Sequence, residues 1–175
     1  MSNNRSSGRC KVYLCCTSLQ PGNCINDAIN SFSKGNSWAQ HWLLVFDYGQ
    51  NDVLICDADN HGGELTGRTY WKKRAALENY EKKIYLGKRN IPEERIYSLV
   101  RKRGDSGQYH YTDNNCQKWA QDLLRELDIE MPADEVDART VVTNYIQPAA
   151  FAGGTVVGVC GIGVLIYMSC RNKRE

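Results

Sequence analysis

Cys116 and His41 are the residues of this sequence best suited to nucleophilic chemistry. Cys116 follows three residues that favour helix N-caps, at 113–115, and is therefore expected to begin a helix. Free N–H groups and the helix dipole favour the thiolate at that position. An attacking thiolate also needs a base within hydrogen-bond reach and a third group that orients the base. His41 is the best candidate for the base, because it starts an apolar strand and shares a face with Leu43 and Val45.

The third group is expected on the strand that returns after His41. If paired residue numbers across that hairpin sum to 101, Asn60 lies opposite His41, and a slip of one residue places Asp59 or His61 there. All three are polar and able to orient an imidazole; His61 and Asp59 are near equals, with Asn60 close behind. The backbone N–H of Cys116 is expected to donate to an oxyanion.

Simpler explanations exist for each of these residues. A single cysteine on an apolar helix face is usually part of the core, and a histidine at a strand end usually satisfies a backbone group. The alternative to an enzyme is therefore a binding module in which Cys116 only packs. The spacing of the eight cysteines and three histidines matches no zinc motif, so neither a metal nor an organic cofactor is expected.

The pattern of apolar, turn and capping residues predicts an α+β domain. Strands are expected at 11–14, 41–48, 53–58 and 83–86, with a loop at 59–67. Helices are expected at 26–32, from Pro92 to the stop at Gly104, and at 116–127. The domain is expected to span residues 10–131, after a disordered leader at 1–9.

Composition excludes several classes of protein. Without residues 149–175, the chain has 19 basic and 19 acidic side chains, so a globally basic nucleic-acid binder is excluded. With 24% charged and 42% hydrophobic residues, the chain is neither a multi-span membrane protein nor mostly disordered. The length of 175 residues suits one domain.

The C-terminal residues predict a membrane anchor. After a linker at 132–148, residues 149–170 carry no charge, and about 20 apolar residues span a bilayer. Gly154 and Gly158 form a GxxxG pattern that permits close helix packing in lipid. We expect a single-pass tail anchor in the endoplasmic reticulum or the mitochondrial outer membrane, with the domain in the cytosol. The basic tail at 171–175 opposes the positive-inside rule, so the orientation stays open.

Residues 68–103 are strongly basic. They hold 12 basic and four acidic side chains. This excess describes either an ordinary solvated face or a surface for anionic lipid or an acidic protein partner. No aromatic motif for RNA accompanies it, so no nucleic-acid partner is expected.

Two stretches of the sequence resemble the permuted papain-like His…Cys families. They are HWLLVFDYG, followed by a returning strand, and YHYTDNNCQKWAQDLL. The resemblance covers about residues 10–131 and implies a permuted papain-like fold. It also implies Cys116 as the nucleophile, His41 as the base, and no metal or organic cofactor.

Two branches of these families are similar to this chain. One is the lecithin:retinol acyltransferase-like group, which acts on phospholipids and often has a C-terminal membrane segment. The other is the PPPDE group of thiol isopeptidases, which act on ubiquitin-like conjugates. The first branch usually has a second histidine where this sequence has Ile55-Cys56-Asp57, and both more often have other residues at Gln117 and Trp119. The stretch YLGKRNIPEERI resembles the PPPDE branch, whereas the anchor and the basic region resemble the lipid branch.

The sequence therefore predicts a membrane-anchored thiol hydrolase or acyltransferase. His41 would deprotonate Cys116, which would form a thioester from an ester or amide substrate. The acyl group would come from a lipid or from a ubiquitin-like isopeptide. A catalytically inactive binding module of the same fold is the alternative.

Overall fold

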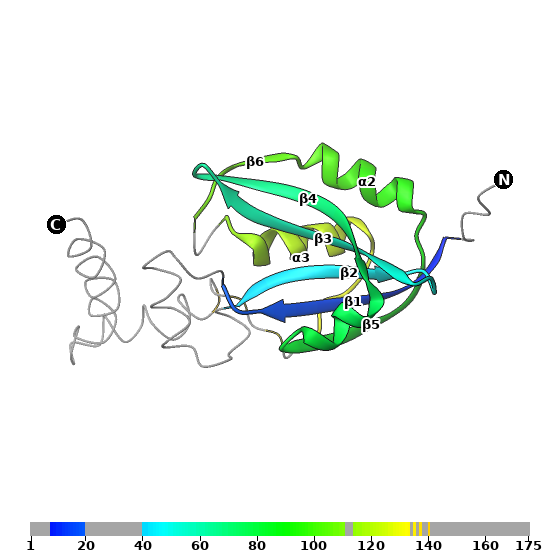
Figure 1. The fold of residues 1–175 in the computed structure, drawn as a ribbon. Helices are drawn as coiled ribbons and strands as arrows, with labels where there is room; N and C mark the ends of the chain where they lie inside the picture. Colours follow the sequence, from blue (N-terminus) through cyan, green and yellow to red (C-terminus); the bar gives the residue numbers. More distant parts are fainter. Residues whose placement is uncertain are drawn as a thin grey trace. The chain divides into compact units, whose positions relative to one another are not determined.

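The structure, a computed structural model, describes residues 8–19, 40–110 and 114–133, together with residues 135, 137 and 140 (Figure 1). The chain divides into two compact units, and the first, Met1–Thr17 with His41–Glu135, contains every element named below. Within the described residues, no helix has the length and apolar character needed to cross a bilayer. The helix predicted at 26–32, the anchor at 149–170 and most of the leader lie outside them. Of that leader, Arg9 already belongs to the first strand.

A six-stranded antiparallel sheet forms the centre of this unit and confirms the predicted α+β class. Its strand order is β5-β1-β2-β3-β4-β6, so β2, β3 and β4 form a meander of consecutive neighbours. The strands are β1 (Arg9–Thr17), β2 (His41–Asp47), β3 (Asp52–His61), β4 (Glu64–Lys73), β5 (Lys82–Asn90) and β6 (Asp105–Gln108).

Two α-helices of the described residues cover one face of the sheet. They are α2 (Glu93–Lys102) and α3 (Cys116–Glu126), close to the predicted helices. Helix α3 contacts β2 and β3, whereas α2 lies against β4 (Figure 1). The main core lies between these helices and the sheet; its largest fully buried members include Trp42, Phe46, Leu44, Leu54, Trp119 and Leu123. Burial of these side chains is the main force that holds α3 on the sheet.

A smaller apolar cluster occupies the opposite face. Side chains alternate between faces along a strand, so Leu43, Val45 and Ile55 point away from α3. The 3-10 helix η2 (Arg74–Asn79) connects β4 to β5 and contributes Leu77 to this cluster, and Tyr80 packs beside it. The sheet is therefore buried on both faces in its central strands, as the apolar character of β2 predicts.

The predicted loop at 59–67 is wrong. Strand β3 continues to His61 and β4 begins at Glu64, leaving a tight turn at Gly62 and Gly63. Both glycines have positive φ, +65° and +96°, which a side chain would strain. The turn needs only Gly62 and Gly63, and the other residues of the predicted loop belong to β3 and β4.

The predicted register of the β2–β3 hairpin is also wrong, by one residue. The structure pairs Val45 with Ile55, so paired numbers sum to 100. Tyr48 does not continue the ladder, because its buried ring packs in the main core and its hydroxyl donates to the Ile91 carbonyl at 2.9 Å. The Asp47 carboxylate accepts the N–H of Gly49 at 2.9 Å and starts the turn instead.

Candidate functional site

Cys116 is the first residue of α3, as the sequence predicts. Asn115 has an extended backbone and is the N-cap; its Oδ1 accepts the N–H groups of Gln117 (3.0 Å) and Lys118 (2.9 Å). The cap takes the second and third N–H groups of the helix and does not take that of Cys116. The Cys116 N–H therefore remains a first-turn donor close to its own thiol.

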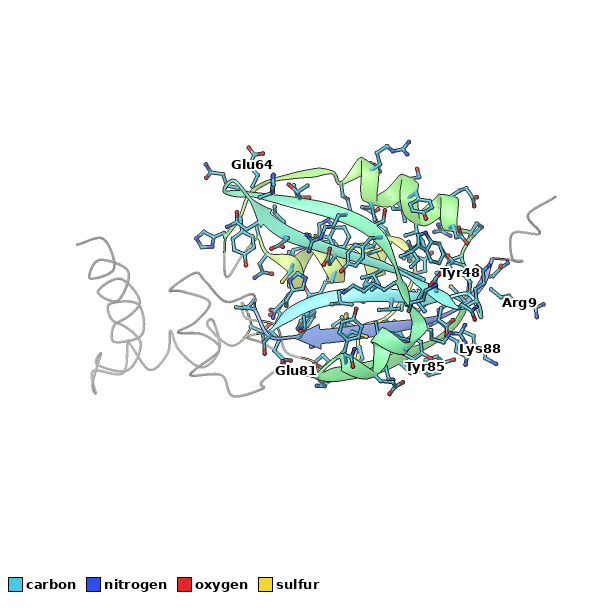
Figure 2. All side chains as sticks on the ribbon, viewed as in Figure 1. Arg9, Tyr48, Glu64, Glu81, Tyr85 and Lys88 are labelled. Carbon is cyan, nitrogen blue, oxygen red and sulfur yellow. The ribbon has the colours of Figure 1, made fainter. Side chains whose placement is uncertain are left out.

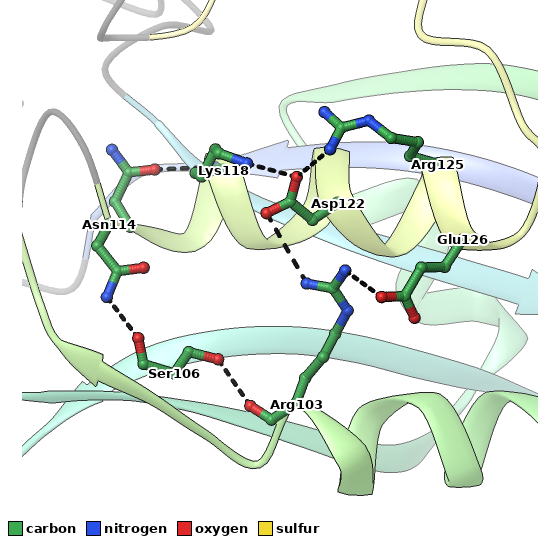
Figure 3. A network of polar contacts seen from close by, with 8 residues as sticks. Arg103, Ser106, Asn114, Lys118, Asp122, Arg125 and Glu126 are labelled. Atoms are coloured by element: carbon green, nitrogen blue, oxygen red, sulfur yellow. Dashed lines mark hydrogen bonds and ion pairs between the residues drawn. The ribbon is translucent and has the colours of Figure 1, made fainter.

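The turn before Cys116 is fixed to β6. Asn114 exchanges backbone hydrogen bonds with His110 and donates its side-chain amide to the carbonyls of Ser106 (2.7 Å) and Gln108 (2.8 Å). On α3, Asp122 binds Lys118, and Arg103 at the end of α2 binds both Asp122 and Glu126 (Figure 3). These contacts fix the start of the helix, and with it the position of the thiol.

His41 and Cys116 meet in the structure. The Cys116 thiol and the His41 imidazole share a side-chain hydrogen bond. His41 is the first residue of β2 and Cys116 the first of α3, and the packing of α3 on β2 brings the two together across 74 residues of intervening chain. The cysteine is buried, with 4% of its surface exposed, and the histidine side chain is 15% exposed.

Asp57 is the third member of this group. The Nε2 atom of His41 lies 3.2 Å from Oδ2 of Asp57, in the middle of β3. Because Nε2 faces the carboxylate, Nδ1 is the ring nitrogen that remains for the thiol. The site therefore has the order thiol, imidazole, carboxylate, which is the arrangement of a nucleophile, its base and an orienting group.

The surroundings of His41 favour its charged form. Burial alone would lower the pKa of the imidazole. The negative charge of Cys116 and the hydrogen bond to Asp57 outweigh burial and raise the pKa to about 10. A protonated imidazole beside a thiolate is the reactive form of a cysteine nucleophile.

Arg68 and Tyr70 on β4 hold Asp57 from its other side. Arg68 donates Nε to Oδ1 at 2.6 Å and Nη2 to Oδ2 at 3.1 Å, and the Tyr70 hydroxyl donates to Oδ2 at 3.2 Å. Burial would raise the pKa of Asp57, but the hydrogen bonds from His41 and Arg68 lower it to about 2. Asp57 is therefore a buried carboxylate that stays ionised across the physiological range.

The residues predicted for the third position lie elsewhere. Asp59 binds Arg68 at 3.3 Å and accepts the N–H of Asn60 at 2.8 Å, while Asn60 accepts the N–H of Gly63 at 2.9 Å. His61 is exposed and pairs with Glu64 at the turn. Four residues along a strand separate His61 from Asp57, or about 13 Å. The structure therefore places Asp57, and none of these three residues, against His41.

The contact between Asp57 and His41 could not be predicted from the sequence, for two reasons. The register is shifted by one residue, and the contact is diagonal: Asp57 pairs directly with Leu43, two residues after His41. Diagonal neighbours on twisted antiparallel strands are within reach of long side chains. The available signal was Asp57 itself, a charged residue between Cys56 and Ala58 in an apolar strand.

The other described cysteines are unsuited to nucleophilic attack. All are buried free thiols. Burial raises the pKa of Cys10 to about 11 and of Cys15 and Cys16 to about 12, and it also raises the pKa of Cys56. These thiols stay protonated near neutral pH. No group of three or more His, Cys, Asp or Glu side chains arranged for a metal occurs in the part of the chain that the structure describes.

Ion pairs neutralise half of the basic region. Of its 12 basic residues, six form ion pairs with acidic side chains: Arg68, Lys73, Arg74, Lys82, Lys83 and Arg103. Lys88 and the half-exposed Tyr85 point outward from the edge strand β5 (Figure 2). The charge available to a partner is therefore smaller than the sequence count implies.

The ionised state of Asp57 predicts a loss of stability in acid. A carboxyl whose pKa falls from 3.8 to about 2 on folding stabilises the fold above pH 4, and this contribution disappears as the pH falls toward 2. Because Asp57→Asn cannot titrate, the advantage of the wild type over this variant should shrink by about 2 kcal/mol between pH 5 and pH 2. Urea unfolding of both full chains at several pH values measures it. A difference independent of pH would contradict this account of Asp57.

Comparison of the chain with protein families, with curated proteins and with solved structures found no match.

Proposed function

We propose that this protein is a thiol hydrolase or acyltransferase with Cys116 as nucleophile, His41 as base and Asp57 as orienting carboxylate. The observation that carries the proposal is that His41 bonds to the Cys116 thiol and to Asp57 at once. A core cysteine or a strand-end histidine would not need this arrangement. The resemblance to permuted papain-like families, with its implied fold, supports the same chemistry.

The geometry supports a two-step reaction. The Cys116 thiolate attacks the carbonyl carbon of an ester or amide and forms a C–S bond, and the carbonyl oxygen becomes an oxyanion near the Cys116 N–H. The imidazolium of His41 gives its proton to the leaving alcohol or amine as the C–O or C–N bond breaks. Water or an amine, deprotonated by His41, then attacks the thioester and releases Cys116.

The substrate remains one of two classes of acyl compound. The uncharged segment at 149–170 and the basic region support a lipid ester at a membrane surface, with anionic lipid or an acidic protein as partner. The resemblance of 85–96 to the PPPDE branch supports a ubiquitin-like isopeptide. Release of fatty acid from phosphatidylcholine vesicles, measured beside cleavage of an isopeptide-linked ubiquitin conjugate, separates the two.

The nucleophile is tested by acetylation with p-nitrophenyl acetate. In the full chain in detergent micelles, we expect an acetyl thioester on Cys116, because only this described thiol faces an imidazole. Cys116→Ala should abolish the adduct and lower nitrophenol release to the rate of the buffer. Cys10→Ala, which removes a buried thiol at the other end of the sheet, should match the wild type. Equal acetylation of wild type and Cys116→Ala would overturn the proposal.

A binding module without catalysis is the second candidate. The burial of Cys116 favours it, because an acyl carbonyl must reach the sulfur. A folded wild-type protein that forms no Cys116 adduct with p-nitrophenyl acetate would support this function.

A further inference from the structure

Arg68 binds the carboxylate of Asp57 through two hydrogen bonds. Its Nε and Nη2 atoms lie 2.6 and 3.1 Å from the two carboxylate oxygens, the arrangement in which a guanidinium fixes both position and orientation. The Asp57 side chain is 2% exposed, whereas that of Arg68 is 48% exposed. The Arg68 side chain is therefore about half exposed to water, while its guanidinium reaches the buried carboxylate.

Charges alternate along this line of side chains. Arg68 is positive, Asp57 is negative, and the reactive form of the dyad adds a positive His41 and a negative Cys116. The four groups together are neutral. Without Arg68, the three remaining charged groups would carry a net negative charge in a buried site. Protonation of the Cys116 thiolate would remove that net charge.

We propose that Arg68 is a positioning residue that acts through Asp57 to stabilise the ion pair between the His41 imidazolium and the Cys116 thiolate. The inference rests on the proposed function of Cys116 and His41. It adds a role for a residue of β4 that touches neither the thiol nor the imidazole by a hydrogen bond in the structure. Tyr70 assists by donating to the same carboxylate, and its ring lies beneath the guanidinium, 5.7 Å from ring centre to Cζ.

Among the described residues, other titratable groups around the site come from the neighbouring elements. They are Cys16 on β1, Asp59 on β3, Tyr80 after η2, and Lys82 on β5 with its partner Glu135. Burial raises the pKa of Cys16 and of Tyr80 to about 12, so neither changes charge between pH 4 and pH 9. Asp59 also forms an ion pair with Arg68, and Lys82 forms an ion pair with Glu135. Arg68 is the cation bonded to the carboxylate that orients His41.

The fold supplies a matched control. Arg74 binds the buried Asp47 at 2.8 Å, and its side chain is 42% exposed against 6% for the aspartate. This pair also places a half-exposed arginine on a buried carboxylate, but through an ion-pair contact of Nη2 without the two hydrogen bonds that Arg68 makes. Asp47 ends β2, whereas His41 begins it, so the second pair lies about 20 Å from the dyad.

The experiment measures the rate at which iodoacetamide alkylates Cys116 in the full chain between pH 4 and pH 9, with peptide mass spectrometry to isolate this cysteine. Arg68→Gln should shift the acidic limb of the profile upward by about one pH unit, which is about a 10-fold lower rate at a pH on that limb. Arg68→Lys keeps the positive charge but can make only one of the two hydrogen bonds, so it should recover part of the shift. Arg74→Gln should follow the wild-type profile.

Three outcomes bear on the inference. An unshifted acidic limb in a folded Arg68→Gln protein would overturn it. So would an equal shift in Arg74→Gln, because the effect would then be general to surface charge. A shift confined to Arg68→Gln supports the inference even where no variant forms an acetyl thioester, since alkylation reports the thiolate without turnover; in that case only the proposed function fails.

Discussion

Replacing Asp57 with alanine is expected to slow acetylation of Cys116 by about 10³-fold. The variant loses the acceptor that orients Nε2 of His41 and the negative charge that stabilises the imidazolium. The ring can then rotate away from the thiol, and the proton transfer loses its geometry. The measurement is the burst of nitrophenol from p-nitrophenyl acetate at pH 7.

Asparagine at position 57 separates orientation from charge. Its amide oxygen can still accept from His41, but the carboxylate charge is gone, so Asp57→Asn should slow the reaction by about 10-fold. Asp59→Asn is the control, because Asp59 contacts Arg68 and not His41. If Asp57→Ala reacted at the wild-type rate while folded, Asp57 would have no part in the reaction.

Replacing Trp119 with alanine is expected to lower the free energy of unfolding by about 3–5 kcal/mol. Trp119 is 2% exposed and lies on the face of α3 that packs on the sheet. A Cβ atom built on Gly67 of β4 would lie 2.8 Å from its ring, so the indole fills the space that this glycine leaves. Without the indole, a cavity opens under the first turns of the helix that begins with Cys116. Urea unfolding measures the loss.

Two further variants test this account of Trp119. Trp119→Phe should cost less than alanine, because it keeps a ring and removes an indole N–H that has no hydrogen-bond partner within the described residues. Trp71→Ala removes a ring that is 40% exposed on β4, and should cost about 1 kcal/mol for the lost burial and the hydrogen bond to Tyr97. Similar losses for Trp71→Ala and Trp119→Ala would contradict a special role for packing on Gly67.

Local sequence signals predicted the position of Cys116 well. Asn115 is the observed cap, and α3 begins at Cys116 and ends one residue before the predicted end. These features depend on a few adjacent residues, since a capping side chain reaches only the first turn. The apolar stretch of β2 similarly predicted a central strand with His41 at its start.

The carboxylate half of the site depended on information that is not local. Asp57 meets His41 only through the register of β2 on β3 and the diagonal offset between them, and a single-residue error moves every side chain to the other face. Arg68 belongs to β4, a strand that was not predicted, because its first residues, 64–67, were expected to be part of a loop at 59–67. A register fixed by the turn at Gly49 could not be read from hydrophobicity alone.

The order of the meander has a consequence for synthesis. His41, Asp57 and Arg68 come from adjacent strands within 28 residues of chain, whereas Cys116 follows 48 residues after Arg68. On the ribosome, His41, Asp57 and Arg68 emerge first and can pair through neighbouring hairpins, which are local contacts. Cys116 is synthesised last of the four, on a helix that packs on the completed sheet. The nascent chain can therefore bring Cys116 against His41 only once most of the domain has been made.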